Sequence, residues 1–274
     1  MERRSVVFLI RFVVSCSIPT KHHSCQTIIE DLFMRIQKLS ALILTVCSIA
    51  ALAQLPSAQA AAGDFTPLDI GSPGVAGSVT QAGGGYDITA GGTNVYGASD
   101  QFTFNSQPIT GDFDLRVRVA GLTLADTWSK AGLMARETLV ANSRYAATFA
   151  TPSASGAFFQ YRTNSGAAAV NNGAYPVNYP NTWLRLQRAG NLFTSSASLD
   201  GAAWYQLGSA TIPMTTSAFV GMAVSASVTN GSPVTTSTAQ FRDFGTVSGA
   251  TVATSLPDVE PAGPSSRQIG RAHV

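Results

Sequence analysis

The stretch Trp128-Ser129-Lys130-Ala131-Gly132-Leu133-Met134-Ala135-Arg136-Glu137-Thr138-Leu139 decides the fold class of this chain. Its side chains alternate between two faces, one with Ala131, Leu133 and Ala135 and the other with Gly132, Met134 and Arg136. A helical period can also be fitted, but Gly132, the brevity of the run and the strand-like segments on both sides favour a β-strand. The run also contains Lys130, the only lysine after residue 60.

The same period of two recurs along the chain. It is strongest at Asp114-Leu115-Arg116-Val117-Arg118-Val119, where the apolar residues face one way and the charged residues face the other. No convincing amphipathic helix accompanies these segments, so we predict an all-β chain folded as an antiparallel β-sandwich. The further predicted strands are Tyr86–Thr89, Asp100–Phe104, Tyr145–Phe149, Ala157–Thr163, Thr182–Arg188, Phe193–Leu199, Trp204–Leu207, Phe219–Ala226 and Ala239–Phe244.

Turn residues separate the predicted strands. Asp200-Gly201 is the best hairpin signal, and we expect it to form a type I′ turn, which has φ > 0 at both central residues. Asn171-Asn172-Gly173 is predicted as a second turn. A domain over residues 61–247 is large enough to bury roughly 70% of its unfolded surface, so it should be stable without disulfides.

The first sixty residues are expected to be a targeting segment. Residues 34–60 have a charged start, an apolar core from Leu39 to Leu55 and a small-residue cleavage site at Ala58-Gln59-Ala60, as in a secretory signal peptide. A membrane anchor is the alternative, but the apolar core is shorter than the ~20 residues that a span needs. We therefore expect a mature protein that is secreted, extracellular or periplasmic, without a membrane span. Residues 1–33 are interpreted as a misassigned upstream leader, with a genuine longer leader as the alternative.

The C-terminal end differs in composition from the predicted domain. Residues 248–267 are rich in Ser, Ala, Pro and Gly, which is typical of a disordered linker. Gln268–Val274 can be back-translated to CAG-ATC-GGA-AGA-GCA-CAC-GTC, a common sequencing-adapter oligonucleotide, and an ordinary polar tail is the alternative. On this interpretation the chain is a truncated fragment, and further domains are expected to have followed the linker.

Composition excludes several classes of function. Residues 61–267 contain ten Lys and Arg against twelve Asp and Glu, a net charge of −2, and no basic cluster, so no nucleic-acid partner is expected. Residues 61–247 contain no histidine and no cysteine, which excludes a Ser-His-Asp triad, a Cys-His pair and a thiolate or imidazole metal site in that domain. The residues of these two types all lie outside it: His22, His23, His273, Cys16, Cys25 and Cys47.

Several motifs in a fixed order carry a resemblance to a known family. They are Trp128 with Lys130-Ala131-Gly132 and Arg136-Glu137, then Phe159-Gln160-Tyr161-Arg162-Thr163, Trp183-Leu184-Arg185-Leu186 with Arg188 and Gly190-Asn191, Ser198-Leu199-Asp200-Gly201, and Val220-Gly221-Met222-Ala223-Val224. Together they resemble bacterial secreted concanavalin A-like, laminin G-like domains of the regulation of enolase protein type, a domain of unknown function. The resemblance covers the whole predicted domain and implies a jelly-roll sandwich. It implies no activity, because the family has none settled.

Glu137 is the only glutamate in residues 61–247 and is the candidate for an alternative, enzymatic function. Two-carboxylate glycoside hydrolysis needs a second acid at ~5–9 Å, and Asp126, eleven residues upstream, is the nearest one before it in the chain. The competing interpretation is an ion pair between Glu137 and a neighbouring arginine. No cofactor is expected. A calcium site is an alternative, because hard cations take loop carboxylates, and its candidate ligands are Asp100, Asp112, Asp114 and Asp126.

The candidate ligand-binding residues are Arg116, Arg136, Gln160, Arg162, Trp183 and Arg185. If the apolar residues of their strands face the core, these six share the opposite face, which in a sandwich can be a concave groove that holds glycans. The alternative is a solvated sheet face on which arginine stems cover apolar surface. We thus predict a non-catalytic accessory module that binds a glycan or cell-surface polymer. The alternatives are a glycoside-active enzyme that uses Glu137 and Asp126, and a structural spacer.

Overall fold

A computed structural model describes residues 65–152, 155–228, 235–247 and 251–252 of the chain, and within these ranges it contains strands and no helix. The expected leader and signal peptide, the adapter-like tail and most of the expected linker lie outside these residues. Two linker residues are described and form a short strand, β15. The strands are β1 (Thr66–Ile70), β2 (Ser78–Ala82), β3 (Gly85–Ala90), β4 (Phe102–Thr110), β5 (Phe113–Leu122), β6 (Lys130–Arg136), β7 (Tyr145–Ala150), β8 (Ala157–Arg162), β9 (Val170–Tyr175), β10 (Thr182–Ala189), β11 (Leu192–Ser198), β12 (Ala203–Thr211), β13 (Ser217–Ser225), β14 (Ser237–Thr246) and β15 (Thr251–Val252).

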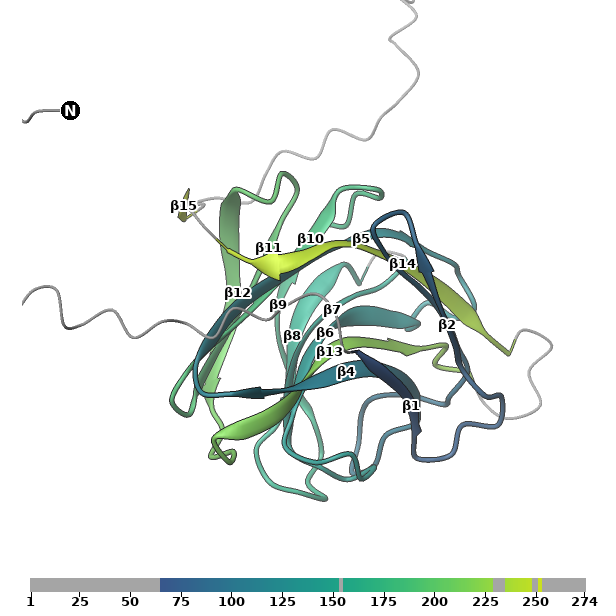
Figure 1. Cartoon of the computed structure of the whole chain (residues 1–274), viewed down its shortest axis with the longest axis horizontal. Coiled ribbons are helices and arrows are strands. Elements are labelled where there is room, and N and C mark those ends of the chain that lie inside the picture. The colour runs from purple at the N-terminus through teal and green to yellow at the C-terminus, as the bar shows by residue number, and fades with distance from the viewer. Residues whose placement is uncertain (1–64, 153–154, 229–234, 248–250, 253–274) are drawn as a thin grey trace, which may run out of the picture. The chain divides into compact units, whose positions relative to one another are not determined.

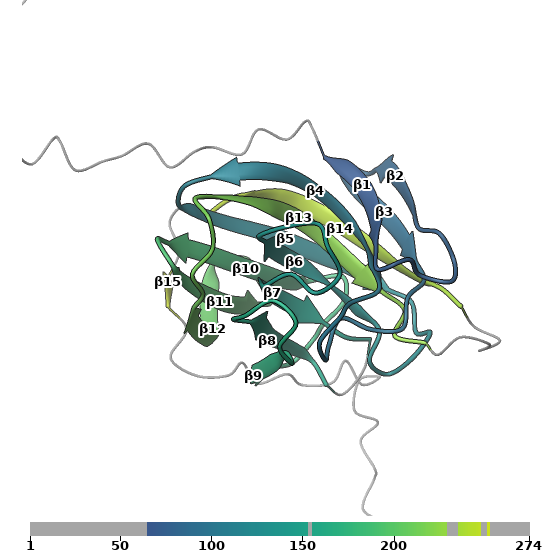
Figure 2. The ribbon, with the colours of Figure 1, turned by 90° about the horizontal axis from the view of Figure 1, so that it is seen from below.

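The strands form two sheets, which confirms the predicted antiparallel β-sandwich (Figures 1 and 2). The seven-stranded sheet has the order β1-β4-β13-β6-β7-β8-β9, and the eight-stranded sheet has the order β15-β12-β11-β10-β5-β14-β3-β2. Late strands lie between early ones in both sheets, as β13 does between β4 and β6, so the connections cross over as in a jelly roll. All pairs are antiparallel except β12 with β15, which is parallel. Within the described ranges no helix is long and apolar enough to cross a membrane.

The main core lies between the sheets and follows the predicted alternation. β10 pairs with β5. In this pairing Leu184 lies opposite Val117 and Leu186 lies opposite Leu115, and all four side chains are buried. Leu133 of β6 faces them from the other sheet and belongs to the same cluster. Burying one such side chain contributes about 1.5–3 kcal/mol, so the register is strongly specified: a slip of one residue would expose the whole set.

β6 lies in the middle of its sheet and is buried along its entire length. Ala131, Leu133 and Ala135 enter the core between the sheets, as predicted. Met134 faces the other way, into a second apolar cluster that includes residues of the loops at 91–101 and 163–169, together with Phe102, Phe104, Tyr145, Phe149, Val95 and Ala169. The outer face of the seven-stranded sheet is therefore covered by loops and is not the open face that the sequence predicted.

Two turn predictions need correction. Asp200-Gly201 does connect β11 and β12 as a hairpin, but only Gly201 has a positive φ (71°), so the turn is not type I′. Instead the carboxylate of Asp200 accepts hydrogen bonds from the N–H groups of Ala202 and Ala203. Asn171-Asn172-Gly173 is part of the edge strand β9 rather than a turn. Glycine is needed at position 173 for two reasons: its φ is positive (74°), and a Cβ would lie 2.4 Å from the carbonyl oxygen of Leu207.

Candidate functional site

A pocket of about 310 Å³ lies at one end of β6 and is lined by Asn94, Tyr96, Trp128, Lys130 and Asn171. Three parts of the chain form it: the 91–101 loop between β3 and β4, the 123–129 loop with the first residue of β6, and the edge strand β9. Its volume is at the lower end of the range for small-molecule sites in proteins.

Two aromatic side chains at this pocket are half exposed, Tyr96 at 49% and Trp128 at 48%. The turn before β6 holds Trp128 in place. The N–H of Trp128 donates to Asp126 Oδ1 at 2.7 Å, and Ser129 Oγ donates to the carbonyl oxygen of Ala226 at 2.7 Å. Two large, half-exposed rings that line the same pocket form an apolar surface of the kind that a ligand covers. The pair is therefore a candidate surface for a ligand.

Lys130 forms the polar wall of the pocket although its side chain is only 2% exposed. Its Nζ donates to Asn94 Oδ1 at 2.6 Å and to the carbonyl oxygen of Val95 at 3.0 Å, and lies 5.7 Å from the ring centroid of Tyr96. Burial lowers the pKa of Lys130 to about 8, and the negative charge of Asp100 opposes this shift. An ammonium group has three N–H donors, so one donor is left without a partner among the described residues.

Asn94 and Asn171 add amide groups to the same pocket. The carbonyl oxygen of Asn94 accepts the N–H of Gln101 at 2.8 Å, which closes the base of the 91–101 loop. Asn171 is exposed on the edge strand β9, and its side chain has no hydrogen bond to another described residue. The pocket thus combines two rings, an ammonium donor and at least one free amide.

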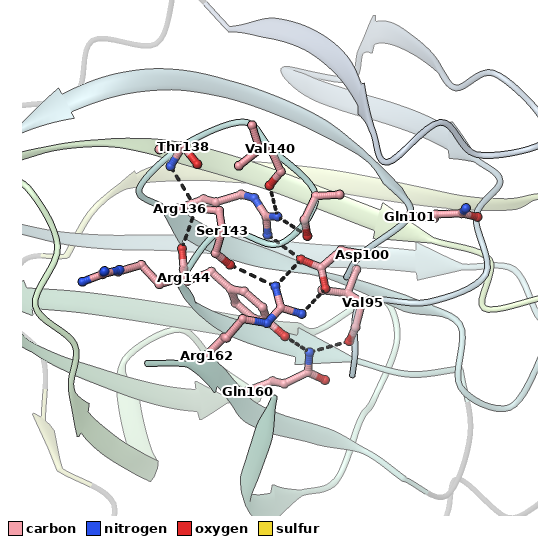
Figure 3. A network of polar contacts seen from close by, with 12 residues as sticks. Val95, Asp100, Gln101, Arg136, Thr138, Val140, Ser143, Arg144, Gln160 and Arg162 are labelled. Carbon is pink, nitrogen blue, oxygen red and sulfur yellow. Dashed lines mark hydrogen bonds and ion pairs between the residues drawn. The ribbon is translucent and has the colours of Figure 1, made fainter. Parts of the chain in front are cut away.

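A buried charged network holds the 91–101 loop against the sheet. Figure 3 shows the guanidinium groups of Arg136 and Arg162 converging on the carboxylate of Asp100, with separations of 2.7 Å from Arg136 and 2.6 and 2.8 Å from Arg162. All three side chains are fully buried. The two arginines also donate to backbone carbonyl oxygens of the 91–101, 137–144 and 163–169 loops. These oxygens belong to Gly97, Val140, Ala141, Ser143 and Ala167.

Gln160 joins this network to the pocket. Its Nε2 donates to the carbonyl oxygen of Val95 at 2.5 Å, the same oxygen that Lys130 contacts, and to the hydroxyl of Tyr145 (Figure 3). Burial raises the pKa of Tyr145, and the nearby charge of Asp100 raises it further. The segment from Asn94 to Asp100 is therefore held against the sheet by side chains of β6 and β8.

The expectation that six candidate residues share one face is wrong. Arg136, Gln160 and Arg162 lie on the seven-stranded sheet and are fully buried, so a ligand in solvent cannot reach them. The other three lie on the outer face of the eight-stranded sheet: Arg116, Trp183 and Arg185. Alternation assigns a side chain to one side of its own strand, but it does not say which sheet the strand joins or whether loops cover that side.

On the eight-stranded sheet the arginines are held by their own neighbours. The guanidinium carbons of Arg116 and Arg118 lie 5.2 and 5.6 Å from the ring centroid of Trp183. Arg185 forms a two-pronged ion pair with Asp114, at 2.6 and 2.7 Å. This matches the alternative of a solvated face with arginine stems on apolar surface more closely than it matches an open groove.

Glu137 and Asp126 cannot act as a pair of catalytic carboxylates. One follows β6 and the other precedes it, and the strand's seven residues alone span roughly 20 Å at about 3.3 Å per residue. Glu137 forms an ion pair with Arg144 at 3.0 Å and accepts the N–H of Thr215. The interpretation of Glu137 as the partner of a neighbouring arginine is confirmed.

The four aspartates considered for calcium do not cluster. Asp100 binds Arg136 and Arg162, Asp114 binds Arg185, and the other two accept backbone N–H groups, Asp112 from Gly190 and Asp126 from Trp128. In the part of the chain that the structure describes, no three His, Cys, Asp or Glu residues lie close enough together to hold a metal ion.

The sequence reasoning missed all five pocket residues as a site, although two of them belong to the stretch that decides the fold. Trp128 and Lys130 stand directly before a fully buried strand, and Lys130 is the only lysine after residue 60. A single lysine in a lysine-poor domain was the available signal. Nothing in the sequence connects these two residues with Asn94, Tyr96 and Asn171, which are distant along the chain.

Comparison with known proteins shows no family for the chain and finds similarity to solved structures at low identity. No protein-family model and no curated protein matches it, so the resemblance to the regulation of enolase type has no support there. Similar solved structures include a functionally unknown protein from Saccharomyces cerevisiae, with 18% identity, a TM-score of 0.49, and 66% of this chain and 94% of that chain covered. The carbohydrate-binding module CBM66 from Bacillus subtilis has 16% identity, a TM-score of 0.41 and coverages of 65% and 92%. Basic winged bean lectin with Tn-antigen has 6% identity, a TM-score of 0.40 and coverages of 66% and 97%.

Proposed function

We propose that this chain is a non-catalytic carbohydrate-binding module and that its ligand enters the pocket beside Tyr96 and Trp128. The observation that carries the proposal is the combination of two half-exposed rings with the amide of Asn171 and the ammonium of Lys130. A sugar ring has an apolar C–H face and an edge of hydroxyl groups. Aromatic rings cover the first, and fixed donors and acceptors bind the second.

The rigidity of the pocket supports the same function. The loop that carries Asn94 and Tyr96 is held by Lys130, Gln160 and Arg162 through the carbonyl oxygens of Val95 and Gly97. A loop that is already ordered loses little conformational entropy when it binds a ligand. This gives the buried arginines and Gln160 a supporting role beneath the site. We also propose that the module is secreted, since the N-terminal sequence has the pattern of a signal peptide.

A glycan array probed with the full chain tests the proposal. For a glycan that binds, Trp128→Ala should weaken the affinity at least about tenfold, because losing a ring contact costs about 1.4 kcal/mol or more. The matched control is Leu192→Ala, which removes an exposed apolar side chain from β11 of the other sheet and should leave binding unchanged. If no glycan binds at millimolar concentration, or if Trp128→Ala binds as well as the unaltered chain, the structural-spacer alternative takes its place.

A further inference from the structure

Lys130 is the only charged side chain that lines the pocket, and no acidic residue lines it. Asp100 is the negative group whose charge acts on Lys130, but both of its oxygens are already bound by Arg136 and Arg162. Among the described residues no carboxylate lies within ion-pair distance of the Lys130 ammonium. The pocket therefore has a net positive wall without a counter-ion of its own.

A buried ammonium without a counter-ion is unfavourable, because burial removes water and nothing of opposite charge replaces it. Its two protein partners, Asn94 Oδ1 and the Val95 carbonyl oxygen, are neutral acceptors. With a pKa of about 8, Lys130 is still mostly protonated at pH 7. Because Lys130 lines the pocket, an anion that enters it would lie near this charge and supply the missing counter-charge.

The position of this charge relative to the rings narrows the class of ligand. The ammonium of Lys130 lies 5.7 Å from the ring centroid of Tyr96, and Trp128 lines the same pocket. One small ligand can therefore contact a ring and the charge together. A free carboxylate or inorganic anion would use the charge but not the rings. A neutral sugar would use the rings but not the charge. Among sugars, only one that carries an acidic group uses both.

We propose that the pocket selects an acidic sugar residue, whose carboxylate or sulfate ester pairs with Lys130 while its ring covers Tyr96 or Trp128. This inference rests on the proposed carbohydrate-binding function and specifies the class of sugar. The ionisable groups around Lys130 are Tyr96 and Asp100 of the 91–101 loop and Asp126 of the turn before β6, with Arg136 and Arg162 behind Asp100. Neither aspartate lines the pocket, so no carboxylate among the lining residues competes with the ligand for the ammonium.

Matched pairs of methyl glycosides provide the test with the full chain. Methyl glucuronide is compared with methyl glucoside, and methyl galacturonide with methyl galactoside, with a galactose sulfate as the second kind of acid. Binding is followed by NMR of the indole N–H groups, because the chain has three tryptophans, Trp128, Trp183 and Trp204, and only Trp128 lines the pocket. We expect at least one acidic sugar to bind about tenfold or more tightly than its neutral twin, as for a charge-assisted hydrogen bond, and to shift only the Trp128 signal.

Lys130→Met keeps the length of the side chain and removes the charge, so it should abolish the preference for the acidic sugar. Arg118→Met removes one positive charge from the eight-stranded sheet and should preserve the preference. Comparing the two sugars on the unaltered chain keeps the test valid if the Lys130 variant fails to fold. Raising the pH from about 7 to 9 should weaken the acidic sugar alone, because the ammonium loses its proton near pH 8.

The outcomes separate the two proposals. Equal affinity for acidic and neutral sugars, both lost in Trp128→Ala, overturns the acidic-sugar inference and leaves the carbohydrate-binding function in place. A preference that survives in Lys130→Met, or is equally lost in Arg118→Met, also overturns the inference. If N-acetylglycine binds as tightly as the uronides, the site recognises carboxylates without a sugar. If no sugar at all shifts the Trp128 signal, the proposed function itself fails.

Discussion

On the outer face of the seven-stranded sheet Arg136 and Arg162 are fully buried, whereas on the outer face of the eight-stranded sheet Arg116 and Arg185 remain partly exposed. Both pairs come from strands with the same alternation, and both have an aspartate nearby. On the covered face the aspartate is on a loop and the ion pairs hold that loop down. On the open face Asp114 belongs to strand β5, and its ion pair with Arg185 of β10 does not fix a loop.

This difference favours the covered side of the sandwich as the place of the proposed binding site. Loops that cover a sheet can bring together residues from distant parts of the chain. The 91–101 loop does so when it places Asn94 and Tyr96 at the same pocket as Trp128 and Lys130. On the open face the arginines are already paired with their neighbours: Arg185 with Asp114, Arg118 with Asp243 and the carbonyl oxygen of Pro180, and Arg116 with the carbonyl oxygen of Gly201.

Asp100→Asn should destabilise the chain by about 3–5 kcal/mol, because it leaves two buried guanidinium groups without their counter-charge. The matched change on the open face, Asp114→Asn, should cost less than about 1 kcal/mol, since that ion pair is partly exposed to water. Chemical denaturation of both variants measures the difference. Similar costs for the two would mean that the covered and open faces are energetically alike.

Stability should rise between pH 8 and pH 9.5, and Lys130 should be the cause. Burial lowers the pKa of Lys130 from 10.5 in a free side chain to about 8, so the unfolded chain binds more protons in this range. The folded state therefore becomes relatively more stable as pH rises, by up to roughly 2 kcal/mol at about 1.4 kcal/mol per pH unit. The measurement is urea denaturation at intervals of pH.

Lys130→Met should remove this rise, and Arg118→Met should retain it. Above about pH 10 the raised pKa values of Tyr145 and Tyr179 act in the opposite direction, because the unfolded tyrosines then lose protons first. The comparison is therefore made below that pH. A rise of the same size in Lys130→Met would show that another group causes it.

Gly132→Ala should destabilise the chain by about 1–3 kcal/mol, the usual cost of overpacking. A Cβ at Gly132 would lie 2.0 Å from the carbonyl oxygen of Thr148 and 2.8 Å from the ring of Phe149, so β6 and β7 would have to separate. Gly245→Ala is the control, because on β14 of the other sheet a Cβ would meet nothing within 4 Å. Thermal melting of the two variants measures the difference in stability. Equal melting temperatures would contradict the tight packing of β6.

Trp183→Ala should have the smallest effect, about 1 kcal/mol, since it removes the cation–π contacts with Arg116 and Arg118 at a partly exposed position. It should not change the affinity for any glycan that binds the unaltered chain, because Trp183 is on the eight-stranded sheet and not in the pocket. A loss of glycan binding in this variant, with the fold intact, would move the site to the open face.

The period-two patterns in the sequence predicted most of the strands and the core. Leu115, Val117, Leu133, Leu184 and Leu186 are buried as predicted, because alternation is a local property that each strand carries by itself. Apart from β15, which lies in the expected linker, three strands were not predicted. β1 and β2 are short and largely exposed, and β9 is an edge strand with Asn-Asn-Gly in its middle, so all three lack the buried side chains that produce the pattern.

By itself the sequence determined a two-sheet antiparallel sandwich, its core residues, and a domain without histidine or cysteine chemistry. Only the tertiary structure decided that Arg136, Gln160 and Arg162 are buried supports, and that Asn94, Tyr96, Trp128, Lys130 and Asn171 meet at one pocket. The physical reason is the range of the interactions. Alternation depends on neighbours two residues apart, whereas the pocket depends on loops that Asp100 anchors through arginines 36 and 62 residues further along the chain.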